Sequence, residues 1–182
     1  IYTLTFYNAI ANGGKMVKPR FVKAELKDGV VVREFPVEVV KEQICSKSTL
    51  QDIQDILEMV VSKGLGKQAG CPQFKVSGKT GTAQISKGKG GYKSGGMHYL
   101  VSFCGYFPSE APKYSCIVAI QKSGLPASGG GQCGPVFREI AQSVMAKGVF
   151  REPREGADST SIFIPDVSNG NMQAAAQVLE SL

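Results

Sequence analysis

Three strand-like runs follow one another over residues 74–85, 99–107 and 114–122, and no helical pattern separates them. All three are rich in β-branched and aromatic residues, the types that favour strands. A glycine- and lysine-rich loop (86–96) joins the first two runs, and a short turn with two prolines joins the last two. Parallel strands need long crossovers that usually contain a helix, so these links predict an antiparallel sheet.

Helical patterns lie on both sides of these strands. Residues 3–11 read as the end of a helix, which the Asn-Gly-Gly at 12–14 stops by supplying a left-handed cap. A second helix is predicted over residues 48–64, where Ser48 and Gln51 have capping-box spacing. Its apolar residues recur every three or four positions: Leu50, Ile53, Leu57 and Val60.

A third helix is predicted from Pro135, a favoured first helical residue that follows a glycine-rich stretch, to about Lys147. Its predicted apolar face consists of Val136, Ile140 and Val144. Near the start of the chain, residues 19–26 and 30–35 read as a hairpin around the Asp-Gly turn at 28–29. Helices before and after an antiparallel sheet predict an α+β fold.

Composition divides the chain into a body (1–149), a polar linker (150–161) and a new apolar pattern (162–182). The net charge is +6; the residues from 150 onward hold two basic and five acidic side chains, so the body carries +9. A basic body suits an anionic partner and equally suits an ordinary soluble surface. Nucleic acid is not expected, because the lysines are scattered and no nucleic-acid-binding motif is present.

Two further features concern targeting and metals. No apolar run approaches the roughly 18 residues that a membrane span needs, and the chain starts at Ile1, so we expect an excised piece of a longer protein. The five cysteines form no Cys-x-x-Cys pair and His98 is the only histidine, so neither a metal site nor a cofactor is expected. Cys104 and Cys116 lie in neighbouring strand-like runs and could face each other; buried free thiols are the alternative.

One strand carries the residues that suggest chemistry. Within the sequence VSGKTGTA at 76–83, Lys79 supplies charge, Thr80 and Thr82 supply hydroxyl groups, and Gly81 leaves room for close approach. A ligand can lie along such a strand as an additional ladder partner, through backbone N–H and C=O groups. This edge would suit a peptide that ends in a carboxylate.

Two other interpretations compete with a peptide-binding edge. Gly78-Lys79-Thr80 matches the end of the phosphate-binding P-loop, but Gln73 stands where that motif needs glycine, and no helix is predicted after the threonine. The other interpretation is an ordinary strand with an incidental lysine. Four residues alone do not decide between that strand and a binding edge, whereas their surroundings do.

Lys-Thr-Gly is the third element of the active-serine penicillin-recognising set, after S-x-x-K and S-D-N. Residues 1–149 resemble the penicillin-binding transpeptidases of that family beyond the motif itself. The segments that carry the resemblance are LTFYNAIANGGKMVK followed by Pro-Arg (4–20), the helix before the motif (51–66), the strand HYLVSFCGYFP (98–108) and the closing helix (131–145). A threonine directly after Lys-Thr-Gly is typical of the class B, cell-division type. In the tail, Ile-Pro-Asp-Val at 164–167 and the helical pattern after it resemble the opening of a PASTA module, which follows some of these enzymes.

The resemblance implies the C-terminal part of the penicillin-binding, serine β-lactamase-like transpeptidase fold, and a peptidoglycan D,D-transpeptidase as the whole protein. In that family a serine attacks a stem peptide ending in D-Ala-D-Ala, an amine resolves the acyl-enzyme, and penicillin mimics the donor. By motif position, Lys79 belongs near the proton relay, and the backbone N–H of Thr82 is one oxyanion donor. These two residues are thus the expected catalytic ones. The expected substrate-binding residues are Lys79, Thr80, Gly81 and Thr82.

The sequence departs from the family in lacking a suitable S-x-x-K. Ser86-Lys87-Gly88-Lys89 has the right letters but lies in the loop after the motif, and the Ser-Asn at 168–169 lies in the tail. We therefore expect the nucleophile upstream of Ile1, and this chain alone to be inactive. For His98 both a place on the rim of the site and a structural role stay open.

The resemblance also implies partners and a location. Expected partners are peptidoglycan stem peptides, β-lactams and cell-division proteins, and the expected place is outside the cytoplasm, in the periplasm or on the outer face of the cytoplasmic membrane, held by an upstream transmembrane helix. The chain itself is expected to form homo-oligomers, because part of its sheet would lack its helical cover. A non-catalytic sensor of β-lactams or muropeptides is the alternative function; a multi-pass signalling region upstream would indicate it, and a single-pass anchor with a pedestal would indicate a synthase.

Overall fold

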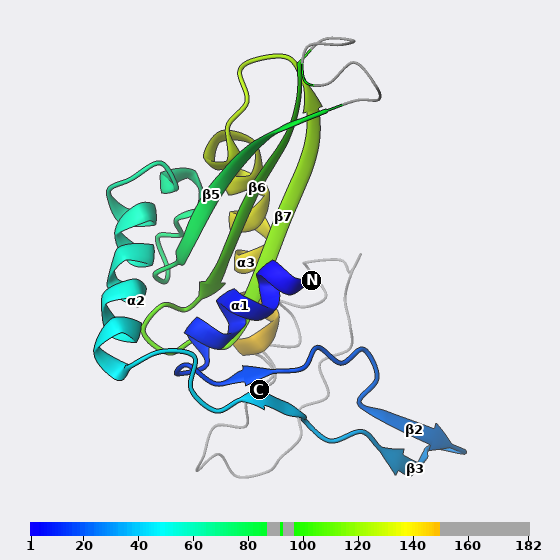
Figure 1. Ribbon diagram of the computed structural model, residues 1–182. Helices are drawn as coiled ribbons and strands as arrows, with labels where there is room; N and C mark the ends of the chain where they lie inside the picture. The colour runs from blue at the N-terminus through cyan, green and yellow to red at the C-terminus, as the bar shows by residue number, and fades with distance from the viewer. Residues whose placement is uncertain (87–91, 93–96, 150–182) are drawn as a thin grey trace, which may run out of the picture. The chain divides into compact units, whose positions relative to one another are not determined.

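The computed structural model describes residues 1–86, 92 and 97–149 (Figure 1). Contacts group Ile1–Val149 into one compact unit. The predicted linker (150–161) and the PASTA-like segment (162–182) lie outside the described residues and stay predictions. None of the helices within the described ranges is long and apolar enough to cross a membrane.

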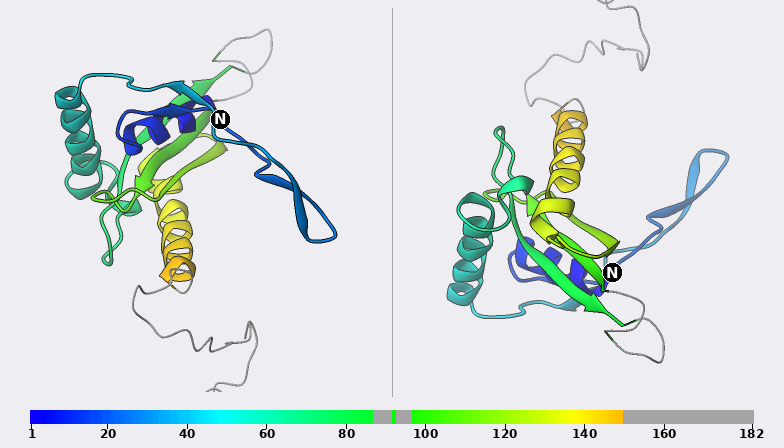
Figure 2. Two further views of the ribbon diagram at one scale, coloured as in Figure 1. Left: turned by 90° about the horizontal axis from the view of Figure 1, so that it is seen from below. Right: turned by 90° about the horizontal axis from the view of Figure 1, so that it is seen from above.

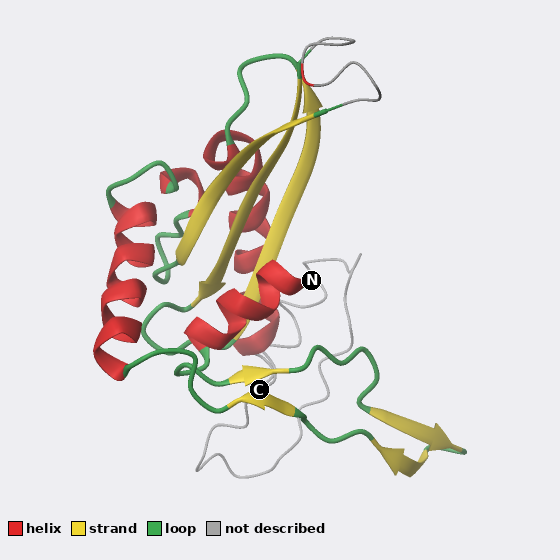
Figure 3. Ribbon diagram, in the orientation of Figure 1, coloured by secondary structure: helices red, strands yellow, loops and turns green. Residues whose placement is uncertain are grey.

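The centre of the unit is a three-stranded antiparallel sheet in the order β5 (Ser77–Ile85), β6 (His98–Phe107) and β7 (Tyr114–Ser123). Figure 3 shows these strands side by side, with helices around them. The predicted α+β fold is confirmed, and the first predicted strand begins three residues later than expected, at Ser77.

Helices cover both faces of this sheet. α1 (Tyr2–Ala11) and α3 (Gly134–Val149) lie on opposite faces, as the two views of Figure 2 show. α2 (Lys47–Ser62) lies beside β5 (Figures 1 and 2). The sheet is therefore sandwiched, which explains why the sequence of β6 reads as apolar almost throughout.

Two apolar clusters hold these layers together. On the α3 side, Phe103, Phe107 and Phe137 are almost completely buried, and the Phe137 ring centroid lies 4.7 Å from that of Phe103 and 5.6 Å from that of Phe107. The α1-side cluster consists of Ile10, Leu50, Leu57 and Tyr106. On β6, Val101, Phe103 and Phe107 belong to the first cluster and Tyr106 to the second, as the pleat of a strand requires.

The helix after residue 46 starts differently from the prediction. Ser46, with φ −62° and ψ 156°, is the N-cap, and its Oγ accepts a hydrogen bond of 3.2 Å from the backbone N–H of Thr49. The predicted capping box of Ser48 and Gln51 is wrong, because Ser48 already lies in the first helical turn and Gln51 bonds to Asp55 instead, at 2.8 Å. The buried residues of this helix are Leu50, Leu57 and Val61.

The buried face of α3 is rotated by one residue from the prediction. Val136 and Ile140 are 40% and 38% exposed, whereas Phe137 is fully buried. A turn of π-helix (Gly129–Cys133) runs directly into α3. Ala141 is also buried, and Val144 packs against the same cluster as Phe137. Residues 137, 141 and 144 have helical spacing, as do 136, 140 and 144, so spacing alone does not decide between these two faces.

The predicted hairpin is present as β2 (Ala24–Lys27) and β3 (Val30–Glu34). Asp28 and Gly29 between them have φ values of 51° and 80°, as the favoured tight hairpin turn needs. The first strand begins at Ala24, five residues later than predicted. The hairpin projects away from the sheet (Figure 1). Closer to the sheet, β1 (Met16–Val17) pairs with β4 (Val39–Lys41).

All five cysteines are free thiols. Cys104 lies opposite Ile117 and Cys116 lies opposite Gly105, so the two cysteines point to opposite faces of the sheet. The register excludes a disulfide between them, and the alternative of free thiols holds.

We expect Cys104 to resist alkylation in the native protein. Burial, and secondly the nearby Cys116, raise the pKa of the Cys104 thiol from 9.0 to about 12, and only the thiolate is a good nucleophile. Between pH 9 and pH 12 the thiol is ionised in the unfolded chain but protonated in the folded one, so the free energy of unfolding should fall as pH rises through this range. The resistance of Cys104 to alkylation is tested by mass spectrometry after treatment with N-ethylmaleimide at pH 8, with half-buried Cys45 as the comparison. Rapid modification of native Cys104 would contradict it.

Candidate functional site

The Lys79–Thr82 segment lies in the middle of β5, at the edge of the sheet. β6 pairs with one side of β5, and no strand pairs with the other side within residues 1–86 and 97–149. Lys79 and Thr82 are exposed, and Thr80 and Gly81 are half-buried. The segment therefore presents backbone and side chains together on an accessible strand edge.

The pleat divides this segment between the two faces. Lys79 lies opposite Cys104 and shares the α1-side face, while Thr80 lies opposite Phe103 and shares the α3-side face with Thr82. The Lys79 ammonium nevertheless reaches the edge, because its Nζ donates to the Thr80 carbonyl at 2.9 Å and lies 3.5 Å from Thr80 Oγ1. The structure thus brings the predicted charge and one predicted hydroxyl together.

Gly81 has a structural neighbour that the sequence did not indicate. A methyl group at Gly81 would lie 2.5 Å from the Oγ of Ser102, the residue opposite it on β6. The missing side chain at this position therefore leaves room for Ser102 as well as for a ligand.

The start of β5 is fixed by polar contacts. The Ser77 hydroxyl lies 2.8 Å from the Ser109 hydroxyl, and the backbone N–H of Ser109 donates to the Lys75 carbonyl at 3.0 Å. The Lys75 ammonium pairs with Glu58 on α2 at 2.9 Å. The hydrogen bond from Lys75 to Glu58, and secondly the Glu58 charge, raise the pKa of Lys75. These contacts tie the strand to α2 just before the Lys79–Thr82 segment.

Two further residues reach this part of β5 and were missed from the sequence, Gly129 and Gly130, and the Leu65 carbonyl lies beside Gly130. Leu65 is 84% exposed and follows α2, and the two glycines lie in the π turn before α3. The available signal was the run of three glycines at 129–131, which is unusual directly before a helix.

His98 lies beyond the end of the segment. It stands opposite Ile85, three residues along β5 from Thr82 and six from Lys79, which correspond to about 10 Å and about 20 Å of extended strand. Its Nδ1 is 2.9 Å from the Ser123 hydroxyl on β7. This placement favours the structural interpretation of His98 over a place on the rim of the site.

The positive charge belongs to the half of the chain that contains this sheet. Residues 1–62 hold eight basic and eight acidic side chains, whereas residues 63–149 hold eleven basic and two acidic ones. A positive field on this half of the body favours an anionic ligand such as a carboxylate.

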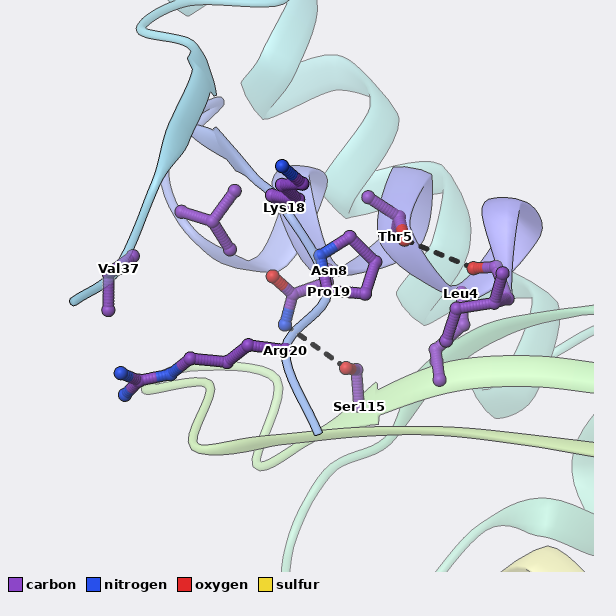
Figure 4. Close-up of a pocket in the computed structure, with 10 residues that line it drawn as sticks. Leu4, Thr5, Asn8, Lys18, Pro19, Arg20, Val37 and Ser115 are labelled. Atoms are coloured by element: carbon purple, nitrogen blue, oxygen red, sulfur yellow. Dashed lines mark hydrogen bonds between the residues drawn. The ribbon is translucent and has the colours of Figure 1, made fainter. Parts of the chain in front are cut away.

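A separate hollow of about 230 Å³ lies two strands away from β5, between α1, the segment after β1, and β7 (Figure 4). At its base, Asn8 donates to the Ser115 hydroxyl at 3.1 Å. Its two cations are also engaged, Lys18 with Glu38 at 2.8 Å and Arg20 with a backbone carbonyl. Because these polar groups already have hydrogen-bond partners, the hollow does not present a set of free donors to a ligand.

Comparison with known proteins assigns the family. The model of the penicillin binding protein transpeptidase domain matches residues 1–142. A peptidoglycan D,D-transpeptidase FtsI homolog of Mesostigma viride is 30% identical over 152 residues, which cover 76% of this chain and 25% of that protein. Penicillin-binding protein PbpB of Mycobacterium tuberculosis is 32% identical, with 78% and 22% covered.

Solved structures agree with this assignment. Penicillin binding protein 3 of Mycobacterium tuberculosis, also solved in complexes with aztreonam and ampicillin, has a TM-score of 0.63 and 28% identity over 80% of this chain and 34% of that one. A peptidoglycan glycosyltransferase homologue from Atopobium parvulum gives a TM-score of 0.59 and 29% identity, with 79% and 32% covered. The chain spans about a quarter of the length of the curated relatives that it matches. The predicted resemblance to a class B, FtsI-type transpeptidase domain is thereby confirmed, and the chain belongs to the penicillin-binding protein transpeptidase domain family.

Proposed function

We propose that this chain supplies the substrate-binding strand of a peptidoglycan D,D-transpeptidase, which cross-links stem peptides through an acyl-serine intermediate and is acylated by β-lactams. The observation that carries the proposal is the open edge of β5 at Lys79–Thr82, where charge, hydroxyl and strand backbone are accessible together. The named activity of the relatives and the β-lactam complexes of one of them support it.

Binding follows from the geometry of this edge. A stem peptide can add to β5 as a further strand, with backbone hydrogen bonds fixing its direction. Its terminal carboxylate would then meet the Lys79 ammonium and the Thr80 hydroxyl, which lie 3.5 Å apart. A carboxylate acceptor adds the attraction of opposite charges, which the uncharged Thr80 carbonyl lacks, so the ammonium can exchange one bond for the other.

The chemistry is acyl transfer. The serine oxygen forms a bond to the penultimate carbonyl carbon, the carbon–nitrogen bond to the terminal D-Ala breaks, and that amine leaves with a proton. An amine of a second stem peptide then attacks the same carbonyl carbon. The ester bond to the serine breaks, and a proton from the amine returns to the serine oxygen. Thr82 contributes its backbone N–H to the developing oxyanion, a role worth about 10²–10³ in rate. Lys79 adds positive potential beside the proton relay.

The nucleophile belongs, in this proposal, to residues outside the 182 of this chain. Ser77 is 1% exposed and bonded to Ser109, so it cannot reach a substrate. Ser86 follows the end of β5, four residues beyond Thr82. We further propose that residues 1–149 form the C-terminal part of the transpeptidase domain, that residues 162–182 begin a PASTA-like module, and that the enzyme works outside the cytoplasm, anchored by an upstream helix, with cell-division proteins as partners.

The experiment on Gly81 separates ligand approach from packing. In the full-length protein, Gly81→Ala is expected to lower the rate of acylation by a fluorescent penicillin by about 10-fold or more, because the methyl group crowds both Ser102 Oγ and the ligand. Adding Ser102→Ala removes the crowded oxygen and should restore the melting temperature but not the acylation rate. Ser102→Ala alone is the control. Full recovery of acylation in the double variant would show that Gly81 serves packing only.

A further inference from the structure

We infer that Gly129 and Gly130, in the π turn before α3, are positioning residues that fix the Lys79–Thr82 segment in its reactive place. The inference rests on the proposed function and adds residues that never touch the substrate. It follows from how closely this turn approaches the backbone of β5.

Gly129 lies directly against peptide groups of β5 and β6. A methyl group at Gly129 would lie 2.5 Å from the carbonyl oxygen and 2.9 Å from the nitrogen of Gly81, and closer still to the carbonyl oxygen of Ser102. Real Cβ atoms essentially never approach other atoms within 3.0 Å. All three neighbours are backbone atoms, which cannot rotate away as a side chain can. Only glycine therefore lets the turn pack this closely behind Gly81.

Gly130 makes the equivalent contact one residue further on. A methyl group there would overlap the carbonyl oxygen of Leu65 and lie 3.3 Å from the methyl carbon of Thr80. Leu65 stands between α2 and the short η1 helix (Lys67–Ala69). The turn therefore fills the space between the end of α2 and the strand, and touches β5 at two consecutive residues of the segment.

The turn itself is held firmly. The Ser128 hydroxyl accepts from the backbone N–H of Gly131 at 3.1 Å, and the Gln132 side chain accepts from the backbone N–H of Ser128 at 2.8 Å. Cys133 is fully buried, and its thiol donates to the Val101 carbonyl on β6 at 3.4 Å. Added bulk at Gly129 would thus press on the peptide groups of Gly81 and Ser102, and β5, which is paired on one side only, is the more easily displaced of the two strands.

The consequence falls on the chemistry because Gly81 lies between Thr80 and Thr82. A shift of β5 at Gly81 moves the Thr82 N–H, which is proposed to stabilise the oxyanion. Misplacement of about 1 Å can cost about 10²-fold in rate. The long, exposed Lys79 side chain can follow a small shift, so initial binding should suffer much less than the acylation step.

The test uses the full-length protein and three alanine variants of one turn. Gly131 is the matched control, because a methyl group there would meet only the Ser128 side chain, at an ordinary 3.4 Å. Acylation by a chromogenic or fluorescent penicillin is separated into an apparent affinity and a first-order rate, per mole of folded protein. Gly129→Ala should reduce the rate about 10²-fold with an affinity change of only a few-fold. Gly130→Ala should also slow the rate, while Gly131→Ala should stay within about two-fold of the wild type.

Two further variants separate the possible outcomes. Lys79→Ala reports on the proposed function, which fails if this variant is acylated at the wild-type rate. If Lys79→Ala is acylated slowly but Gly129→Ala has the same acylation rate as Gly131→Ala, only the positioning inference is overturned. Ser128→Ala adds no atom and removes the acceptor that fixes the turn, so it tests the same idea if Gly129→Ala does not fold. A selective loss of acylation rate in Ser128→Ala supports the inference. An unchanged rate, or an equal loss in an Ile10→Val variant of matched melting temperature, overturns it.

Discussion

Replacing Lys79 by alanine in the full-length protein is expected to slow acylation by penicillin about 10²–10³-fold while leaving the fold intact. Lys79 is exposed, and within residues 1–86, 92 and 97–149 its ammonium donates only to the neighbouring Thr80. An exposed side chain of this kind contributes little to stability, so the melting temperature should hardly change. Its charge matters only when a carboxylate and a developing oxyanion are present.

The matched control for this experiment is Lys27→Ala. Lys27 is also an exposed strand lysine, but it lies on the projecting hairpin. Both variants lose one positive charge, so the comparison of their acylation rates is independent of net charge. The rates are measured by stopped flow or on gels. Near-normal acylation in Lys79→Ala would show that the open edge of β5 is not where the ligand binds.

The 182-residue chain alone is expected to form no covalent penicillin adduct at all. Three serines lie near the segment. Ser77 is buried, Ser102 lies on β6, across β5 from the open edge, and Ser86 lies about 13 Å along the strand from Thr82 by strand geometry. None of them can attack a carbonyl held at the Thr82 N–H. A denaturing gel after incubation with a fluorescent penicillin gives a direct answer, with the full-length protein as the labelled reference and circular dichroism as the check on folding.

A stable labelled band from the chain would contradict this expectation. Loss of that band in Ser86→Ala, but not in Ser77→Ala, would then identify an internal nucleophile, and the proposed origin of the serine would have to be abandoned.

The sheet was predictable because each of its strands is specified locally. The runs that became β6 and β7 begin within one residue of the predicted starts, since β-branched and aromatic residues are bounded there by glycine and proline. The position of the Lys79–Thr82 segment on a strand was predictable for the same reason. That β5 is the edge strand follows from pairing order, which local patterns do not contain.

Other features are not specified by the pattern of residue types. The choice of Ser46 over Ser48 as the cap depends on where the backbone leaves the extended region, and both serines fit the sequence pattern. Apolar residues have helical spacing on two neighbouring faces of α3, and only packing against the sheet decides that Phe137 and Ala141 are the buried ones. The approach of Gly129 to Gly81 joins residues 48 positions apart, so a glycine run alone could not indicate its partner.

The open side of β5 has a consequence for solubility. A strand edge that accepts a short peptide also accepts the edge of another protein molecule, which is how sheets aggregate. A lysine in the middle of an exposed edge opposes that pairing by its charge, and Gly78 and Gly81 weaken it by their low strand propensity. The residues proposed to bind the short, charged end of a peptide thus also oppose pairing with a long, uncharged strand of another molecule. Selection against aggregation and selection for substrate binding would therefore favour the same residues at this edge.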